Sequence, residues 1–228
     1  MDVTRPLPPE ARSDARLIAW LTVVGLLSAA NFYGNATESP PDNAVFQWST
    51  VANQGTFLVI LFAIMLAIAG LKHPRGMFAL WRPKSIPRAI GLGAALVVAV
   101  YAFLAVTSPL LSPGKDQGLT PSGWDSGHAP QYIANFILIA CIVPIVEELT
   151  FRGLGYSLLA PLGRWPAILG IGLLFGLSHG LVLLLPVIVF FGCLLAWVRA
   201  RTDSVFPGMV AHGVFNLIAL IAAVTIGS

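Results

Sequence analysis

The sequence has few charged residues. Asp, Glu, Lys and Arg together make up 10% of its 228 residues, whereas a soluble domain carries about 25%. Hydrophobic residues make up 57%, and they fall in runs long enough to cross a bilayer, which takes roughly 20 residues per helix. The low charge and the long runs exclude a soluble globular protein and indicate a helical membrane protein.

Other features are also scarce or missing. The two cysteines, Cys141 and Cys193, both lie inside apolar runs, so a disulfide framework is not supported. Short alternating segments, which would indicate a β-barrel, are absent, and so is the internal repeat of many transporters. The formal net charge of +3 comes from basic residues in loops between apolar runs, which is not the pattern of a nucleic-acid-binding protein.

Hydropathy predicts seven membrane spans. Their expected ranges are 17–33, 50–71, 89–111, 133–159, 165–179, 181–198 and 205–226. No small-residue cleavage site follows the first run, so we interpret it as a membrane anchor and not as a signal peptide. We therefore expect an all-α, multi-pass fold in which residues 1–228 form a single bundle with a polar cavity inside the membrane.

Basic residues alternate between the two sides of this arrangement. The N-terminal segment and every second loop hold most of them, namely Arg5, Arg12, Arg16, Lys72, Arg75, Arg82, Lys84, Arg88, Arg164, Arg199 and Arg201. The loops on the other side hold only Lys115. By the positive-inside rule we expect the N-terminus in the cytoplasm and the C-terminus outside. Residues 35–37 match a glycosylation sequon, which also occurs by chance in polar loops.

Two adjacent acids interrupt the fourth predicted span. Placing Glu147 and Glu148 in a membrane-spanning helix costs free energy. Insertion scales give roughly 2.5–3.5 kcal/mol for a group such as Asp at a helix centre. Arg152 is four residues after Glu148, so we expect these two to share a helix face and pair. Glu147 lies about 100° round the helix, with Phe151 lining its side, and is left as a general base. The alternative is that both acids simply pair with Arg152.

Polar residues interrupt two later spans as well. The fifth span ends at His179, and the seventh holds His212 and Asn216, which are four residues apart and share a face. Lipid offers these side chains no hydrogen-bond partners. We therefore expect them to converge with the acids on one polar cavity.

Two chemistries suit such a cavity. In the first, Glu147 and a histidine polarise a water for attack on a peptide carbonyl, while Asn216 and the other histidine stabilise the oxyanion. In the second, Glu147, His179 and His212 bind Zn²⁺ with water as the fourth ligand. The sequence contains no His-Glu-x-x-His signature of zinc proteases. Both chemistries remain open at this point.

Three motifs follow one another in the second half of the chain. They are Glu-Glu-x-x-Phe-Arg-Gly at 147–153, Phe-x-x-x-His at 175–179 and His-x-x-x-Asn at 212–216. In these motifs the sequence resembles the CPBP family of intramembrane proteases, which includes type II CAAX prenyl endopeptidases and bacterial self-immunity, or abortive infection, homologues. The resemblance separates residues 1–130, which hold spans and external loops without a motif, from a protease-like core at 131–228.

The resemblance implies an intramembrane endopeptidase. Glu147 would activate the water with help from His179, and His212 and Asn216 would complete the site and stabilise the oxyanion. Structural support of the site would come from Glu148, Phe151, Arg152 and Phe175. The family has been described both as metalloproteases and as glutamic proteases. The expected cofactor is therefore either none or Zn²⁺, held in that case by Glu147, His179 and His212.

The expected partners are membrane lipid and a peptide or protein substrate, which can be lipid-anchored; no nucleic acid is expected. Prenylated CAAX proteins are a eukaryotic substrate class. For a bacterial or archaeal plasma membrane, the candidates are peptide pheromones, bacteriocin precursors and membrane-protein tails. Two alternatives to an enzyme are a non-catalytic immunity or scaffold protein of the same fold and a proton-coupled transporter.

The two histidines are expected at different depths if the helices stand upright. At 1.5 Å per residue, His179 lies about 22 Å along the fifth span and His212 about 10 Å along the seventh. We therefore predict tilted helices and a turn within the membrane near residues 180–186.

Overall fold

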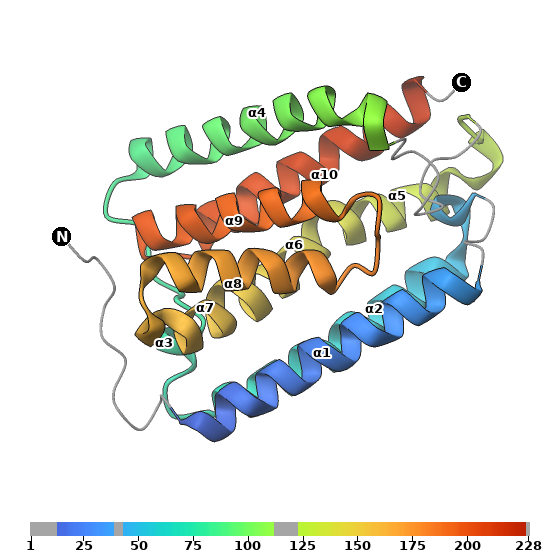
Figure 1. Cartoon of the computed structure of the whole chain (residues 1–228). Coiled ribbons are helices and arrows are strands. Elements are labelled where there is room, and N and C mark those ends of the chain that lie inside the picture. Colours follow the sequence, from blue (N-terminus) through green and yellow to red (C-terminus); the bar gives the residue numbers. More distant parts are fainter. Residues whose placement is uncertain (1–12, 39–42, 112–122, 227–228) are drawn as a thin grey trace.

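The computed structural model describes residues 13–38, 43–111 and 123–226, which form a bundle of helices (Figure 1). No strand occurs among these residues. The predicted all-α, multi-pass architecture is confirmed. Arg5, Arg12 and Lys115, which contributed to the predicted charge alternation, lie outside the described residues.

The helices fall into three groups. The long separate helices are α1 (Asp14–Thr37), α2 (Trp48–Ala69), α4 (Ile86–Leu111), α8 (Arg164–Leu177), α9 (Leu185–Thr202) and α10 (Phe206–Ile226). A continuous helical path is made of α5 (Ala129–Ile137), η5 (Leu138–Ile142), α6 (Val143–Glu148), η6 (Leu149–Gly155), α7 (Tyr156–Leu159) and η7 (Ala160–Leu162). Short turns of helix are η2 (Ala44–Phe46), α3 (Pro74–Met77) and η4 (Ser126–His128).

Within the described part of the chain, six helical segments are long and apolar enough to cross a membrane, and α8 is a shorter seventh. The fourth segment, Ser126–Leu162, has 37 residues and is longer than the predicted range 133–159. By contrast, α8 has 14 residues, about 21 Å, which is less than the roughly 30 Å hydrocarbon core. A turn lies at residues 178–184, close to the predicted range 180–186, and the chain reverses there before the end of the bundle (Figure 1). That this turn lies within the membrane, and that the helices tilt, stays a prediction.

The long helices run side by side, with α4 at one edge of the bundle and α1 at the opposite edge (Figure 1). Close packing of α8 on α9 depends on small residues, as is common for helices in membranes. A Cβ at Gly172 would lie 2.2 Å from Cys193 Sγ, and one at Gly192 would lie 2.9 Å from the Gly172 Cα. This close contact brings the α9 backbone near the side chains of the fourth segment.

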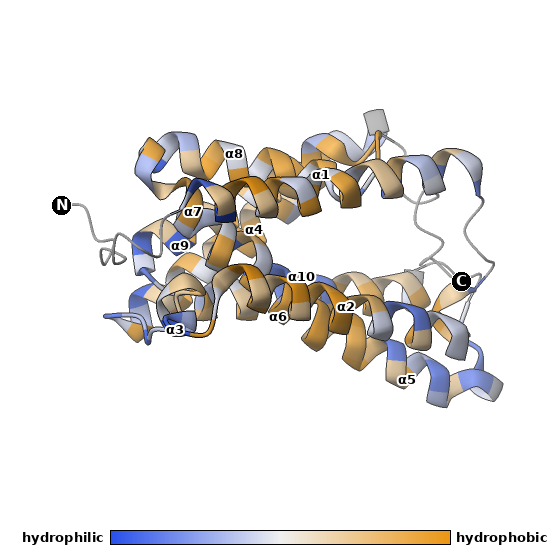
Figure 2. Cartoon of the chain, turned by 90° about the horizontal axis from the view of Figure 1, so that it is seen from below, coloured by the Kyte–Doolittle hydropathy of each residue, from blue (hydrophilic) through white to orange (hydrophobic). Residues whose placement is uncertain are grey.

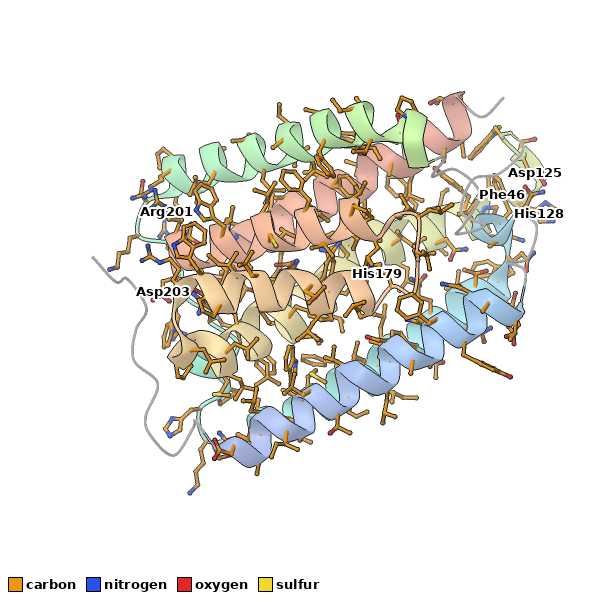
Figure 3. The ribbon with its side chains drawn as sticks, in the orientation of Figure 1. Phe46, Asp125, His128, His179, Arg201 and Asp203 are labelled. Carbon is orange, nitrogen blue, oxygen red and sulfur yellow. The ribbon has the colours of Figure 1, made fainter. Side chains whose placement is uncertain are left out.

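Apolar residues cover the middle of the bundle, and hydrophilic ones gather toward its two ends (Figure 2). The Val205 amide donates to the Ala79 carbonyl at 3.3 Å, so the α9–α10 junction lies beside the loop after α3. Arg201 and Asp203 lie at this end and Asp125 and His128 at the other (Figure 3). Helix α1 begins at the first end and α10 ends at the second (Figure 1); the cytoplasmic assignment of the first end stays a prediction.

Candidate active site

The fourth helical segment changes its winding around the two acids. Short helix α6, which carries Glu147 and Glu148, lies between the π-helical turns η5 and η6. Such turns are rare and occur frequently at functional sites. The regular α-helix expected over 133–159 is therefore interrupted twice, on either side of the acids.

Glu148 and Arg152 form the expected ion pair. Arg152 Nη1 donates to Glu148 Oε1 at 2.9 Å, and neither side chain has solvent-exposed surface. Arg152 Nη2 donates to the Gly192 carbonyl at 3.1 Å. Space for the carboxylate comes from Gly208 of α10, where a Cβ would lie 2.5 Å from Glu148 Oε2. Each buried ion would cost several kcal/mol without such partners, so the pair is tightly constrained.

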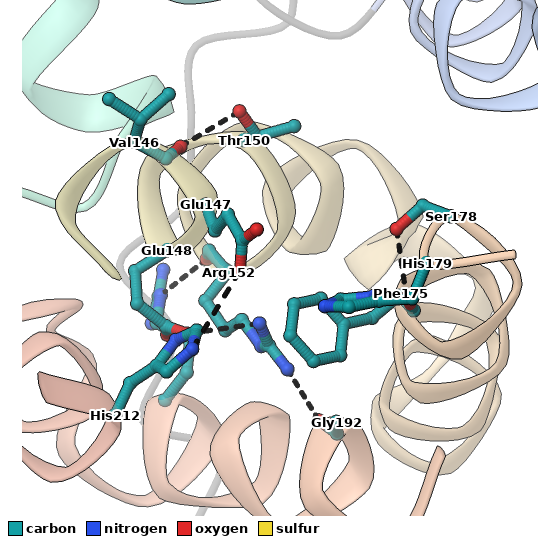
Figure 4. Close-up of polar contacts among 11 residues, drawn as sticks. Val146, Glu147, Glu148, Thr150, Arg152, Phe175, Ser178, His179, Gly192 and His212 are labelled. Atoms are coloured by element: carbon teal, nitrogen blue, oxygen red, sulfur yellow. Dashed lines mark hydrogen bonds and ion pairs between the residues drawn. The ribbon is translucent and has the colours of Figure 1, made fainter. Parts of the chain in front are cut away.

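His212, on α10, joins the two acids (Figure 4). Its Nδ1 lies 3.2 Å from Glu148 Oε1 and its Nε2 lies 3.7 Å from Glu147 Oε2. Glu148 accepts as an ionised partner of Arg152, so Nδ1 carries the hydrogen of this contact. The imidazole thus presents one ring nitrogen to each of the two carboxylates.

The two adjacent acids differ in accessibility. The side chain of Glu148 is 0% exposed, whereas that of Glu147 is 21% exposed. The 3.7 Å contact of Glu147 with His212 Nε2 is also longer than a direct hydrogen bond. Glu147 is therefore the acid that a substrate or a water molecule can reach.

Phe175, on α8, packs against the buried guanidinium. Arg152 Cζ lies 4.1 Å from the centroid of the Phe175 ring, well within cation–π range. Phe151 meets Phe175 edge-on at 5.2 Å between centroids, and His212 does so at 5.9 Å. Phe175 is fully buried. The two phenylalanines thus pack near the buried guanidinium, and the expected place of Phe151 beside Glu147 stays a prediction.

His179 follows the end of α8, and its ring is held by the preceding turn. His179 Nδ1 lies 2.7 Å from the Phe175 carbonyl oxygen, and because a carbonyl only accepts, Nδ1 carries the hydrogen. The ring also packs on the Phe175 ring at 4.6 Å between centroids (Figure 4). In the neutral imidazole, Nε2 is then left as a hydrogen-bond acceptor.

Asn216 lies one turn beyond His212, and its amide is bonded to the fourth segment. Asn216 Nδ2 donates to the Ile139 carbonyl, in η5, at 2.9 Å. Close approach of α10 at Gly213 makes this possible, since a Cβ there would lie 2.8 Å from the Ala140 carbonyl oxygen. The structure thus connects Asn216 to the backbone of η5, and its expected oxyanion role stays a prediction.

The zinc alternative can be compared with this arrangement. Within residues 13–38, 43–111 and 123–226, no three His, Cys, Asp or Glu side chains are grouped as ligands for a metal ion. Glu148 Oε1, which lies 3.2 Å from His212, is already paired with a guanidinium. The choice between no cofactor and Zn²⁺ stays a prediction.

Helix α1 makes contacts with this region that the motifs did not reveal. Trp20 Nε1 donates to the Thr150 carbonyl at 3.1 Å, and Asn31 and Asn35 donate to carbonyls of the turn after α8. The available signal was the four-residue spacing of the two asparagines near the end of an apolar helix, the same spacing that marked His212 and Asn216.

The fold and the site define a class, that of polytopic helical membrane proteins with a buried cluster of glutamate, arginine and histidine. Residues 129–218 match a family model described as Rce1-like, type II CAAX prenyl endopeptidase Rce1-like. Over these residues the chain is similar to type II CAAX prenyl endopeptidases. The match supports a peptidase in general, and the matched segment includes all three motifs. Comparisons with curated proteins and with solved structures found no match.

Proposed function

We propose that this protein is an intramembrane endopeptidase in which Glu147 activates the attacking water. The observation that carries the proposal is the different surroundings of the two adjacent acids. Glu148 is fully buried against Arg152, whereas Glu147 is partly exposed beside His212 Nε2. One acid therefore has a structural partner, and the other is available as a general base.

In the proposed reaction, Glu147 takes a proton from water, and the hydroxide so formed attacks the carbonyl carbon of the scissile peptide bond. His179 Nε2, the free ring acceptor, assists in orienting the water. Negative charge develops on the carbonyl oxygen, and a fixed donor there lowers the barrier. Asn216 has a second amide hydrogen besides the one given to Ile139. The proton on Glu147 then passes to the leaving nitrogen as the C–N bond breaks, giving a carboxylic acid and an amine.

We further propose that the site works without a bound metal. The support is the pairing of Glu148 with Arg152, which places a protein cation next to His212. Cleavage by the purified protein should therefore continue after incubation with 1,10-phenanthroline and dialysis into metal-free buffer. If activity is lost and is then restored by added Zn²⁺, this part of the proposal is overturned and the zinc mechanism is favoured.

The proposed substrates are membrane-associated peptides or the C-terminal segments of proteins, including lipid-anchored ones. The proposed location is the plasma membrane of a bacterium or archaeon, with the N-terminus in the cytoplasm and the C-terminus outside. Prenylated CAAX proteins are the substrates implied for a eukaryotic cell. Peptide pheromones, bacteriocin precursors and membrane-protein tails are those implied for a prokaryotic one.

The test is a comparison of the peptides in membranes of cells that make either the wild type or Glu147→Gln at matched levels. Fragments present only with the wild type would establish proteolysis and identify the substrate. Identical peptide sets, with both proteins inserted and folded, would contradict the proposal and favour a non-catalytic immunity or scaffold protein. Proton-driven transport by the protein in liposomes, without cleavage, would instead favour a transporter.

A further inference from the structure

Two asparagines of α1 hold the turn after α8. Asn31 Nδ2 donates to the Ser178 carbonyl at 2.6 Å. Asn35 Nδ2 lies 3.3 Å from the His179 carbonyl oxygen and 3.1 Å from that of Gly180. The two asparagines are four residues apart and so share a face of the helix. Three consecutive carbonyls centred on His179 therefore have partners on α1.

These carbonyls lie at the end of a short helix, where such partners are needed. The last carbonyls of a helix have no partner within it, and hydrocarbon supplies none. Gly180 has a φ of +68°, and a Cβ there would lie 2.5 Å from the carbonyl carbon of Asn31. The turn therefore rests directly on the α1 backbone, and a side chain at position 180 would push it away.

The first half of α1 is attached to the segment that carries the acids. Trp20 is fully buried, and its Nε1 donates to the Thr150 carbonyl at 3.1 Å. Its ring meets that of Phe151 edge-on at 6.2 Å between centroids. Trp20 and Asn31 are about 16 Å apart along the helix. Helix α1 thus connects the fourth segment with the turn that carries His179.

We propose that Asn31 and Asn35 are positioning residues, which set the place of His179 relative to Glu147. This proposal rests on the proposed function, in which His179 assists Glu147. It also assigns part of the site to α1, which lies outside the matched residues 129–218. The asparagines act through the backbone of the turn and need no contact with the substrate.

The activity test uses Asn31→Ala, Asn35→Ala and the double variant of the full-length protein in liposomes, with a peptide found in the membrane comparison. We expect the double variant to lower kcat by about 10- to 100-fold, because a displacement near 1 Å can cost about that much. KM should change little, since neither residue is assigned a contact with the substrate. Asn35→Gln keeps an amide donor and should recover part of the loss.

Thr37→Ala is the matched control. The Thr37 hydroxyl donates to the Tyr33 carbonyl within α1, and the substitution removes the sequon at 35–37 while leaving both amides in place. Its kcat should equal that of the wild type. A loss as large as in Asn35→Ala would show that a glycan or the helix end is responsible, and it would overturn the proposal.

A second measurement does not depend on activity. The rate of modification of His179 by diethylpyrocarbonate is followed by mass spectrometry, with exposed His128 as the internal reference. In the double variant this rate should rise relative to that of His128, because the turn loses its partners. An unchanged rate in the folded double variant overturns the proposal, whatever happens to kcat.

The two proposals fail in different ways. If the wild type cleaves no peptide, the proposed function fails, and the labelling of His179 still decides whether the asparagines position it. If the wild type is active and the labelling rate is unchanged, only the positioning proposal fails. Should the double variant not fold, Asn35→Ala alone serves in the same comparison, since this side chain is exposed.

Discussion

The helices before residue 112 and two helical segments of the matched region share a bundle but bury different shares of their residues. The apolar stretches of α1, α2 and α4 are 11%, 17% and 22% buried, whereas those of Ser126–Leu162 and Leu185–Thr202 are each 50% buried. The stretch Phe206–Thr225 of α10, at 22%, is buried no more than that of α4. The first three helices are therefore suited to face lipid over most of their surface. The fourth and sixth segments are suited to carry polar groups, because other helices cover them.

The positions of charged residues follow the same division. In α1 and α4 the charged residues, Asp14, Arg16 and Arg88, lie near the start of each helix, and α2 has none. In the matched segment Glu148 and Arg152 lie in the middle of a long helical path and are fully buried. In this comparison, the charged side chains buried in the middle of the bundle are those that have polar partners on a neighbouring helix.

The largest expected effect is that of Glu147→Gln on cleavage. The amide cannot take the proton from water, so kcat should fall by at least about 100-fold, the lower part of the range for a general base. Stability should change little, because Glu147 is partly exposed and Glu148 pairs with Arg152 without it. The measurements are peptide cleavage by the purified variant and its thermal unfolding midpoint. Retention of wild-type kcat would exclude Glu147 as the base.

The same substitution at the neighbouring position should act on the fold. Glu148→Gln leaves the fully buried Arg152 without its counter-ion, and breaking a buried pair in this way costs about 3–5 kcal/mol. The expected result is a large drop in the free energy of unfolding, measured by equilibrium denaturation in mixed micelles. The double variant Glu148→Leu with Arg152→Met should recover much of this loss. Wild-type stability in Glu148→Gln would contradict the assignment of a structural role.

A smaller effect is expected from adding one methyl group beside the ion pair. Gly208→Ala would place a Cβ 2.5 Å from Glu148 Oε2, and the carboxylate is held by Arg152 and His212. Overpacking of this kind costs about 1–3 kcal/mol. Gly91→Ala, on α4, meets nothing within 4 Å and serves as the control. Equal stability of the two variants would show that the site tolerates displacement of Glu148.

Hydropathy located the seven helical segments because a long apolar run in lipid has to satisfy its backbone within a helix. It missed the length of the fourth segment, whose first turns include polar residues such as His128 and Gln131. It also missed the two π-helical turns, since an extra residue in one turn leaves the hydropathy of the segment unchanged. Hydropathy also did not show that α8 ends two residues before His179, because the apolar run predicted over 165–179 continues to that residue.

The four-residue spacing of Glu148 and Arg152 was sufficient to predict their ion pair, because both residues lie on one helix. The spacing of His212 and Asn216 predicted a shared face but not the partners across it, since these depend on how helices pack. The contacts of Asn31 and Asn35 are to backbone carbonyls. Every residue has such a carbonyl, so no side-chain motif marks the receiving positions.

The smallest effect is expected for the exposed pair at the end of the bundle opposite Arg201. His128 Nδ1 lies 2.6 Å from Asp125 Oδ2, with half-exposed side chains. The hydrogen bond from His128 holds the pKa of Asp125 below its ordinary value. Any stabilisation is therefore present above that ordinary value and is lost as the pH falls through the lowered pKa.

Water screens such an exposed pair, whereas the pair of Glu148 and Arg152 is shielded from it. Asp125→Asn should therefore leave the thermal midpoint at pH 7 unchanged within measurement error and remove only a slight dependence at acidic pH. The measurement is the midpoint as a function of pH for the wild type and the variant. A drop near pH 7 as large as that of Glu148→Gln would break the comparison, because burial would then not decide which pairs hold the bundle together.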